Sequence, residues 1–280
     1  MKKSTSAFRL GGVRVPRGES RDIRIELSQS YTGDVISLPV HVLRGKTKGP
    51  TLFVTAAIHG DEINGTGILH EILFDTPLKL VAGTLILVPV VNVFGFETQD
   101  RYMPDRRDLN RFFPGDPTGS LTRRIAHTLF SQIVGQSDFG IDLHTAATGR
   151  TNFPNVRGDL RNKDVRRLAR SFGCELMVHG RGPEGSLRRE AVKAGCPTIL
   201  LEAGEPSKIE RGVQETGVRG ILNVLSDLRM IERQAVQPLY QVKIYRSVWL
   251  RAEAAGILRF HVSPGKLVEA GQAIATNVSV

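Results

Sequence analysis

Hydrophobic residues follow two kinds of pattern along the chain, one typical of β-strands and one typical of α-helices, and segments of the two kinds alternate. Loose alternation of apolar and polar residues over 21–42, interrupted at Thr32-Gly33-Asp34, predicts an antiparallel hairpin. Nearly continuous apolar runs of strand length predict buried strands at 51–58, 84–91, 139–144 and 197–204. Helical spacing predicts helices at 65–74, at 121–133 after Ser120, at 163–172 and at 213–230. The pattern therefore predicts an α/β fold with a mixed, mostly parallel sheet flanked by helices.

The pattern changes near residue 236, where helical spacing gives way to short strands and turns. This change predicts an α/β domain at 1–235 and a small all-β module at 236–280. The runs G-I-L at 256–258, S-P-G at 263–265 and G-Q-A-I at 271–274 resemble half of a biotinyl- or lipoyl-type hammerhead, without a lysine in a Met-Lys context. Since the segment is too short to complete such a module, we expect it to be truncated.

Length and composition exclude several classes of protein. A chain of 280 residues with 40% hydrophobic content can bury a large core, which excludes disordered, collagen-like and disulfide-stapled chains. Its two cysteines, Cys174 and Cys196, are too few for a thiolate zinc site, so any metal would be bound by His, Asp or Glu. No apolar run reaches the length of a signal peptide or of a membrane span, so we expect a cytoplasmic protein without membrane contact.

The chain is strongly basic, with 38 Lys and Arg residues against 28 Asp and Glu. Much of the excess lies between Arg157 and Lys193, including Arg188, in stretches typical of helices with one solvated face. Aromatic residues do not interleave with these bases, as a surface for single-stranded nucleic acid would require. We expect no nucleic-acid partner. A solvated basic face is the favoured interpretation, and a field that attracts small anions is the alternative.

Polar clusters follow the predicted buried strands, at the sheet edge where α/β proteins bind ligands. They are His59 with Glu62, residues 108–111, Asp142 with His144, and Glu202. His59 and Glu62 are three residues apart and share one face of a helical turn, and His144 can reach the same point from another strand. Two histidines and a glutamate with an open fourth position are typical of a catalytic zinc site. The alternative is a surface His-Glu pair and a histidine buried in the core.

Two further carboxylates have alternative roles. On a regular strand Asp142 shares a face with His144, so it is either a buried acid or a group that orients this ligand. Glu202 ends an apolar strand, and partial desolvation should raise its pKa, which suits a general base. A capping or salt-bridged glutamate is the alternative.

Four motifs in this order carry a family resemblance: H-G-D-E at 59–62, D-L-N-R at 108–111, D-L-H-T-A at 142–146 and L-E-A-G at 201–204. Together they resemble the succinylglutamate desuccinylase and aspartoacylase family, which is related to zinc carboxypeptidases. The resemblance covers residues 21–280. It implies a zinc-carboxypeptidase-like sheet and one zinc ion per chain, bound by His59, Glu62 and His144.

The resemblance also implies roles for the remaining site residues. Glu202 would be the general base and acid, and Asp108 would hold a ligand histidine in one tautomer. Asn110 and Arg111 would bind the carboxylate of the amino-acid part of the substrate. An arginine before this pair would stabilise the oxyanion, and Arg101 is preferred over Arg106 and Arg107.

The function implied is a zinc-dependent deacylase that cleaves the amide of an N-acyl amino acid, or of a similar small carboxylate, with metal-activated water. Its partner is then a small anionic N-acyl amino acid, and a homo-oligomer is compatible with the sequence. A zinc carboxypeptidase acting on peptide C-termini is the alternative enzyme. A non-catalytic basic binding protein with a vestigial site is the alternative from another class.

Overall fold

The computed structural model describes residues 8–279, so part of the N-terminal stretch searched for a signal peptide, and Val280, lie outside the described residues. Within this range, most strands join one central sheet. In chain order its strands are β3 (Ser20–Gln29), β4 (Val35–Arg44), β5 (Thr47–Ala56), β6 (Ala82–Val88), β7 (Phe139–His144), β8 (Asn152–Gly158), β9 (Leu176–His179), β10 (Thr198–Gly204) and β11 (Val242–Ile244). Two small sheets are formed by β1 (Phe8–Leu10) with β2 (Val13–Val15) and by β12 (Ile257–Phe260) with β13 (Ala275–Val278).

The central sheet is mixed and mostly parallel, as predicted. Its strand order is β11-β9-β8-β10-β7-β5-β6-β4-β3. The middle of the sheet, from β10 through β7 and β5 to β6, is parallel. At its two sides, β8 runs antiparallel to β10, and β4 runs antiparallel to both β6 and β3. The carboxyl ends of β5, β7 and β10 therefore meet at one edge of the sheet.

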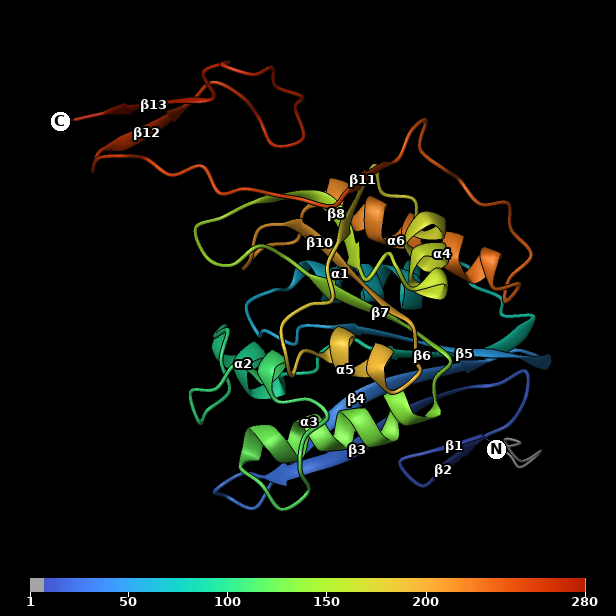
Figure 1. Cartoon of the computed structure of the whole chain (residues 1–280). Coiled ribbons are helices and arrows are strands. Elements are labelled where there is room, and N and C mark those ends of the chain that lie inside the picture. The colour runs from blue at the N-terminus through green and yellow to red at the C-terminus, as the bar shows by residue number, and fades with distance from the viewer. Residues whose placement is uncertain (1–7, 280) are drawn as a thin grey trace.

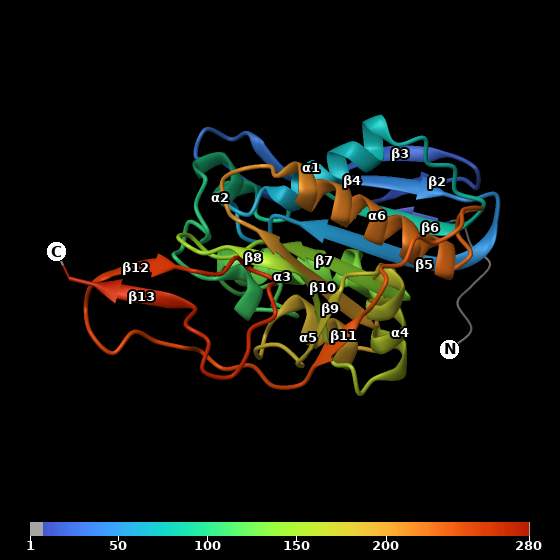
Figure 2. The ribbon, with the colours of Figure 1, turned by 90° about the horizontal axis from the view of Figure 1, so that it is seen from above.

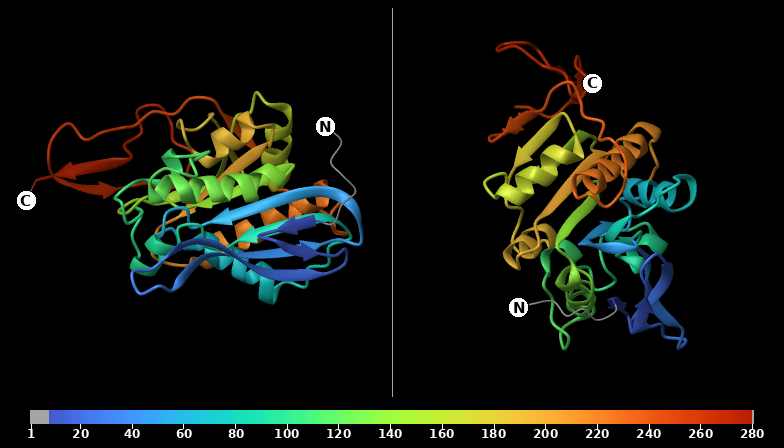
Figure 3. Two further views of the ribbon diagram at one scale, coloured as in Figure 1. Left: turned by 90° about the horizontal axis from the view of Figure 1, so that it is seen from below. Right: turned by 90° about the vertical axis from the view of Figure 1, so that its right-hand side faces the viewer.

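Helices cover both faces of this sheet (Figures 1 and 3). The helices and helical turns are α1 (Asn64–His70), the π-helical turn η1 (Glu71–Asp75), α2 (Val93–Thr98), the 3-10 turn η2 (Leu109–Arg111), α3 (Leu121–Gln132), the 3-10 turn η3 (Val134–Gln136), α4 (Lys163–Phe172), α5 (Leu187–Lys193) and α6 (Arg211–Asp227). Apolar residues of α1, α4 and α6 pack against one face, and those of α3 and α5 pack against the other. Successive residues of β5 point to opposite cores, with Leu52 and Val54 in one and Phe53 in the other.

The predicted helices and strands are present. The boundaries of β7 and α4 coincide with the predicted ones, and Ser120 caps α3 by accepting a hydrogen bond from the backbone N–H of Arg123. β8 and β9 were not predicted. The sequence of β8, Asn-Phe-Pro-Asn-Val-Arg-Gly, lacks apolar alternation because two of its side chains, those of Asn152 and Arg157, face a polar cavity instead of a core.

The described part of the C-terminal segment contains the short strands β11, β12 and β13. β11 extends the central sheet by pairing with β9, while the β12–β13 hairpin projects away from the body of the molecule (Figure 2). The side chains of β12 are all exposed. Among the described residues, no helix has the length and apolar character needed to cross a bilayer.

Candidate active site

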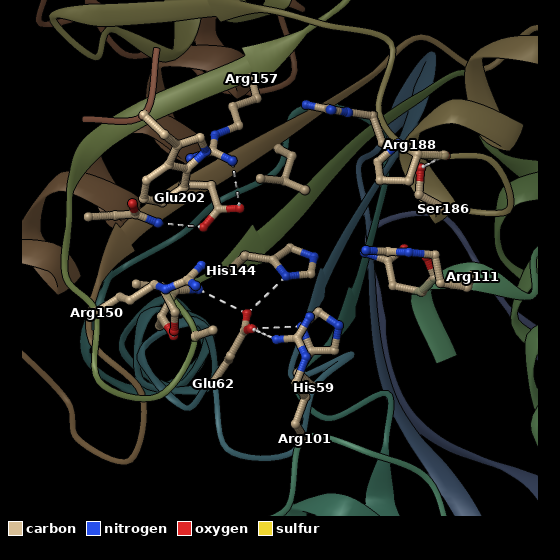
Figure 4. A pocket seen from close by; sticks show the side chains of 18 residues that line it. His59, Glu62, Arg101, Arg111, His144, Arg150, Arg157, Ser186, Arg188 and Glu202 are labelled. Atoms are coloured by element: carbon tan, nitrogen blue, oxygen red, sulfur yellow. Dashed lines mark hydrogen bonds and ion pairs between the residues drawn. The ribbon is translucent and has the colours of Figure 1, made fainter. Parts of the chain in front are cut away.

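A cavity of about 350 Å³ opens where β5, β7 and β10 end (Figure 4). It is lined by seven residues predicted for the site: His59, Glu62, Arg101, Asn110, Arg111, His144 and Glu202. Asp108 and Asp142 lie behind this wall, in contact with the two histidines. The structure therefore brings together residues from all four sequence motifs.

His59, Glu62 and His144 converge on one point. Nδ1 of His59 lies 2.7 Å from one carboxylate oxygen of Glu62, and Nδ1 of His144 lies 2.9 Å from the other. One potential ligand atom from each residue lies within 4.8 Å of the others. The three residues are only 3%, 2% and 5% exposed, respectively, so the cluster is shielded from bulk water.

The local backbone explains why these side chains meet. His144 is the last residue of β7, and the H-G-D-E turn follows β5, the neighbouring strand. Within that turn, the backbone N–H of Glu62 donates to the carbonyl of His59. A Cβ atom on Gly60 would lie 2.0 Å from the backbone of Gly95, so only glycine lets the turn pack this closely against α2.

Each of the two histidines contacts a second carboxylate through its Nε2 atom, on the side of the ring away from Glu62. Nε2 of His59 lies 3.0 Å from Asp108, and Nε2 of His144 lies 2.8 Å from Asp142. The Thr55 hydroxyl donates to the other oxygen of Asp142, at 2.8 Å. These contacts hold both rings with Nδ1 toward the shared point, which is how ligand histidines are oriented in zinc proteins.

The donor set fits a zinc ion. Zinc binds imidazole nitrogen and carboxylate oxygen, and the three converging donors leave room for a further ligand on the cavity side. Burial alone would raise the pKa of Glu62, but the adjacent His144 and His59 lower it below its usual range. Glu62 is therefore a carboxylate anion, as a metal ligand must be.

Glu202 lies across the cavity from this cluster, on β10. Its carboxylate accepts a hydrogen bond from Nδ2 of Asn152 at 2.8 Å, and its other oxygen lies 3.4 Å from a guanidinium nitrogen of Arg157. Both partners come from β8, which runs antiparallel beside β10. Burial raises the pKa of Glu202, as predicted, although the positive charge of Arg157 opposes the rise.

Asn110 and Arg111 lie on the 3-10 turn η2, at another wall of the cavity. The side-chain oxygen of Asn110 accepts from the backbone N–H of Leu187 at 2.8 Å, which ties η2 to the first residue of α5. Arg111 remains partly exposed at the cavity and lies 3.8 Å from Asp108. The pair is thus anchored on one side and accessible on the other.

Of the three candidate oxyanion arginines, Arg101 is the one that lines the cavity within the described part of the chain. Its guanidinium donates to Glu62 at 2.8 Å and reaches Asp108 at 3.5 Å. Arg107 pairs with Asp105 and lies over the ring of Phe112, and Arg106 borders a different hollow. The geometry favours Arg101.

Several cavity residues were not predicted. The prediction of a solvated basic face is wrong for Arg188, which is only 7% exposed and has no hydrogen-bond partner at Nε or Nη1 within the described residues. Arg150, Arg157, Ser186 and Trp249 also line the cavity. No motif marks these residues, because they come from β8 and from loops whose positions depend on the fold. With Arg101 and Arg111, the cavity has five arginines, which supports the alternative that basic charge attracts small anions.

Comparison with known proteins identifies the family. A profile of the succinylglutamate desuccinylase/aspartoacylase catalytic domain matches residues 48–228. The N-alpha-acetyl-L-2,4-diaminobutyric acid deacetylase of Halomonas elongata is 29% identical over 252 residues, 86% of this chain and 73% of that protein. A succinylglutamate desuccinylase/aspartoacylase structure from Rhodobacter sphaeroides is 26% identical, with a TM-score of 0.78 over 92% of this chain and 82% of that one.

A further solved structure shares the fold. The product-bound ectoine utilization protein of Ruegeria pomeroyi superposes with a TM-score of 0.84 over 96% of this chain and 85% of its own, at 23% identity. The profile match, the relatives and the four motifs agree, and the chain belongs to the succinylglutamate desuccinylase/aspartoacylase family.

Proposed function

We propose that the chain is a cytoplasmic, zinc-dependent deacylase that hydrolyses the amide of a small anionic N-acyl amino acid. The observation that carries this proposal is the convergence of His59, Glu62 and His144 at the floor of a cavity that also holds Glu202. The deacetylase of Halomonas elongata supports the reaction class. One zinc ion per chain, held by the three converging residues, would polarise the amide carbonyl and acidify water.

Glu202 is proposed as the group that moves the proton. Its carboxylate takes a proton from the attacking water and passes it to the nitrogen of the leaving amine. Asn152 and Arg157 hold its two oxygens, so the carboxylate has a fixed orientation toward the cavity. Burial raises its pKa and makes it a stronger base than an exposed glutamate.

Arginine and asparagine side chains are proposed to bind the substrate. Arg111 and Asn110 would hold the carboxylate of the amino-acid part, and Arg101 would stabilise negative charge on the carbonyl oxygen. Arg188 supports an anionic substrate, because its Nε and Nη1 are buried without a hydrogen-bond partner among residues 8–279 and a buried cation that lacks partners is costly.

Replacing Arg111 by alanine should raise KM for carboxylate substrates by about ten- to a hundredfold, because a charge-assisted contact contributes about 1.5 to 3 kcal/mol. With an uncharged amide analogue of the substrate, the KM of the Arg111→Ala variant should differ little from that of the parent. The measurement is steady-state amine release with acid and amide forms of one substrate. Arg107→Ala is the matched control, since Arg107 pairs with Asp105 outside the cavity. If the parent enzyme cleaves both forms equally well, the assignment of Arg111 is wrong.

A substrate screen tests the proposed function. N-acetyl, N-formyl and N-succinyl amino acids, including N-acetyl-2,4-diaminobutyrate, are incubated with the zinc-loaded protein, and released amine is measured. Hydrolysis of at least one of these amides is the expected result. Cleavage of an N-blocked peptide at its C-terminus instead would favour a carboxypeptidase. Less than about a tenth of an equivalent of zinc per chain, with no hydrolysis, would favour a binding protein.

A further inference from the structure

The C-terminal part of the chain contributes one residue, Trp249, to the wall of the cavity. Trp249 is the sole tryptophan of the chain and is 74% exposed. Its ring lies 5.3 Å from the guanidinium carbon of Arg150, which also lines the cavity. An aromatic ring in contact with a cation at a cavity mouth offers both an apolar face and a fixed position to a ligand.

The segment that carries Trp249 is attached to the body on both sides of this residue. Before it, β11 pairs with β9. After it, the turn at Gly265 lies so close to Phe153 that a Cβ atom there would be 2.3 Å from the ring, and its φ of +86° favours glycine. The neighbours Val248 and Leu250 are exposed and do not line the cavity. The attachment therefore presents Trp249 alone to the cavity.

Figure 4 places Arg150 on the opposite side of the His144–Glu62 cluster from Arg111 and Ser186. If the amino-acid carboxylate lies on Arg111, as proposed, and the scissile amide lies over the cluster, the acyl group extends toward Arg150. Ala146 and Ala147 precede Arg150 in the loop after β7 and also line the cavity, and their short side chains occupy little of it.

We propose that Trp249, stacked on Arg150, forms the end wall of the acyl subsite and restricts the enzyme to short acyl groups. This inference rests on the proposed function. In this proposal the C-terminal segment selects the acyl group, whereas η2 and the start of α5 hold the amino-acid part of the substrate. Arg150 is a positioning residue that keeps the ring in place.

The test is the dependence of kcat/KM on acyl length, for N-acetyl, N-propanoyl, N-butanoyl and N-succinyl forms of one amino acid. The parent should prefer acetyl over butanoyl by at least tenfold, and Trp249→Ala should reduce this preference below about threefold. Arg150→Met should reduce it partly. Val248→Ala is the matched control and should keep the parental ratio. An unchanged ratio in Trp249→Ala, or a parental preference for succinyl that Arg150→Met abolishes, would overturn the inference.

A binding measurement separates this inference from the proposed function. Because Trp249 is the sole tryptophan, its fluorescence reports on the acyl wall. In zinc-loaded Glu202→Gln protein, an N-acetyl amino acid should change the emission, and the free amino acid should change it by less than about a fifth as much. Failure of hydrolysis in the parent would contradict the deacylase. An unchanged emission, with binding of the N-acetyl compound shown by calorimetry, would contradict the acyl wall alone.

Discussion

Glu202→Gln should lower kcat by about a hundred- to ten-thousandfold, the usual contribution of general acid-base catalysis. Glutamine keeps the volume and the hydrogen bond from Asn152 but cannot accept and return a proton. Zinc content and melting temperature should barely change, because in the described part of the chain the Glu202 carboxylate contacts Asn152 and Arg157 and forms no hydrogen bond or ion pair with the converging histidines. Rates, metal content and melting curves measured on one preparation check all three expectations.

The pH dependence adds a second readout. Glu202 must be deprotonated to act as a base, so kcat/KM should fall as the pH falls through its pKa. Burial raises that pKa, which places the acidic limb above the range of an exposed glutamate, and the limb should change in Glu202→Gln. Glu205→Gln is the control, since Glu205 pairs with Lys208 away from the cavity. Retention of more than about a tenth of kcat, or loss of zinc from the Gln variant, would remove Glu202 from this role.

His144→Ala should abolish both zinc binding and activity, because a histidine and a glutamate alone hold the ion poorly. The fold should survive, since the sheet is supported by two hydrophobic cores on its opposite faces. Metal analysis and circular dichroism on the same sample make the measurement. His70→Ala, an exposed histidine on α1, is the matched control and should keep its zinc. Equal zinc content in His144→Ala and the parent would exclude His144 as a ligand.

The sequence predicted those parts of the fold that depend on local patterns. β5, β6, β7 and β10 are buried on both faces, so their apolar runs are continuous and recognisable. β8 is different, because its residues Asn152 and Arg157 line the cavity and interrupt any apolar alternation. A strand that contributes to a polar site cannot be recognised from hydrophobic spacing alone.

The same distinction applies to the site. His59 and Glu62 were predictable because their spacing of three residues is itself a chemical pattern. Arg188 was not predictable, because the burial of an arginine on a short helix depends on what packs around it. The neighbouring Arg189 has the same local sequence context but is not among the buried residues of α5. Trp249 reaches the cavity only through the path of the C-terminal segment across the molecule, which no local pattern records.

The most direct test of the deacylase proposal is zinc titration of the metal-free protein, with amine release from the best N-acyl amino acid as the readout. The protein from which a chelator has removed the metal should be inactive. Its activity should rise in proportion to added zinc and level off at one equivalent per chain. His59→Ala protein should show no such rise. Full activity in protein from which zinc has been removed, or restoration of activity in His59→Ala by one equivalent of zinc, would contradict a mechanism based on these three ligands.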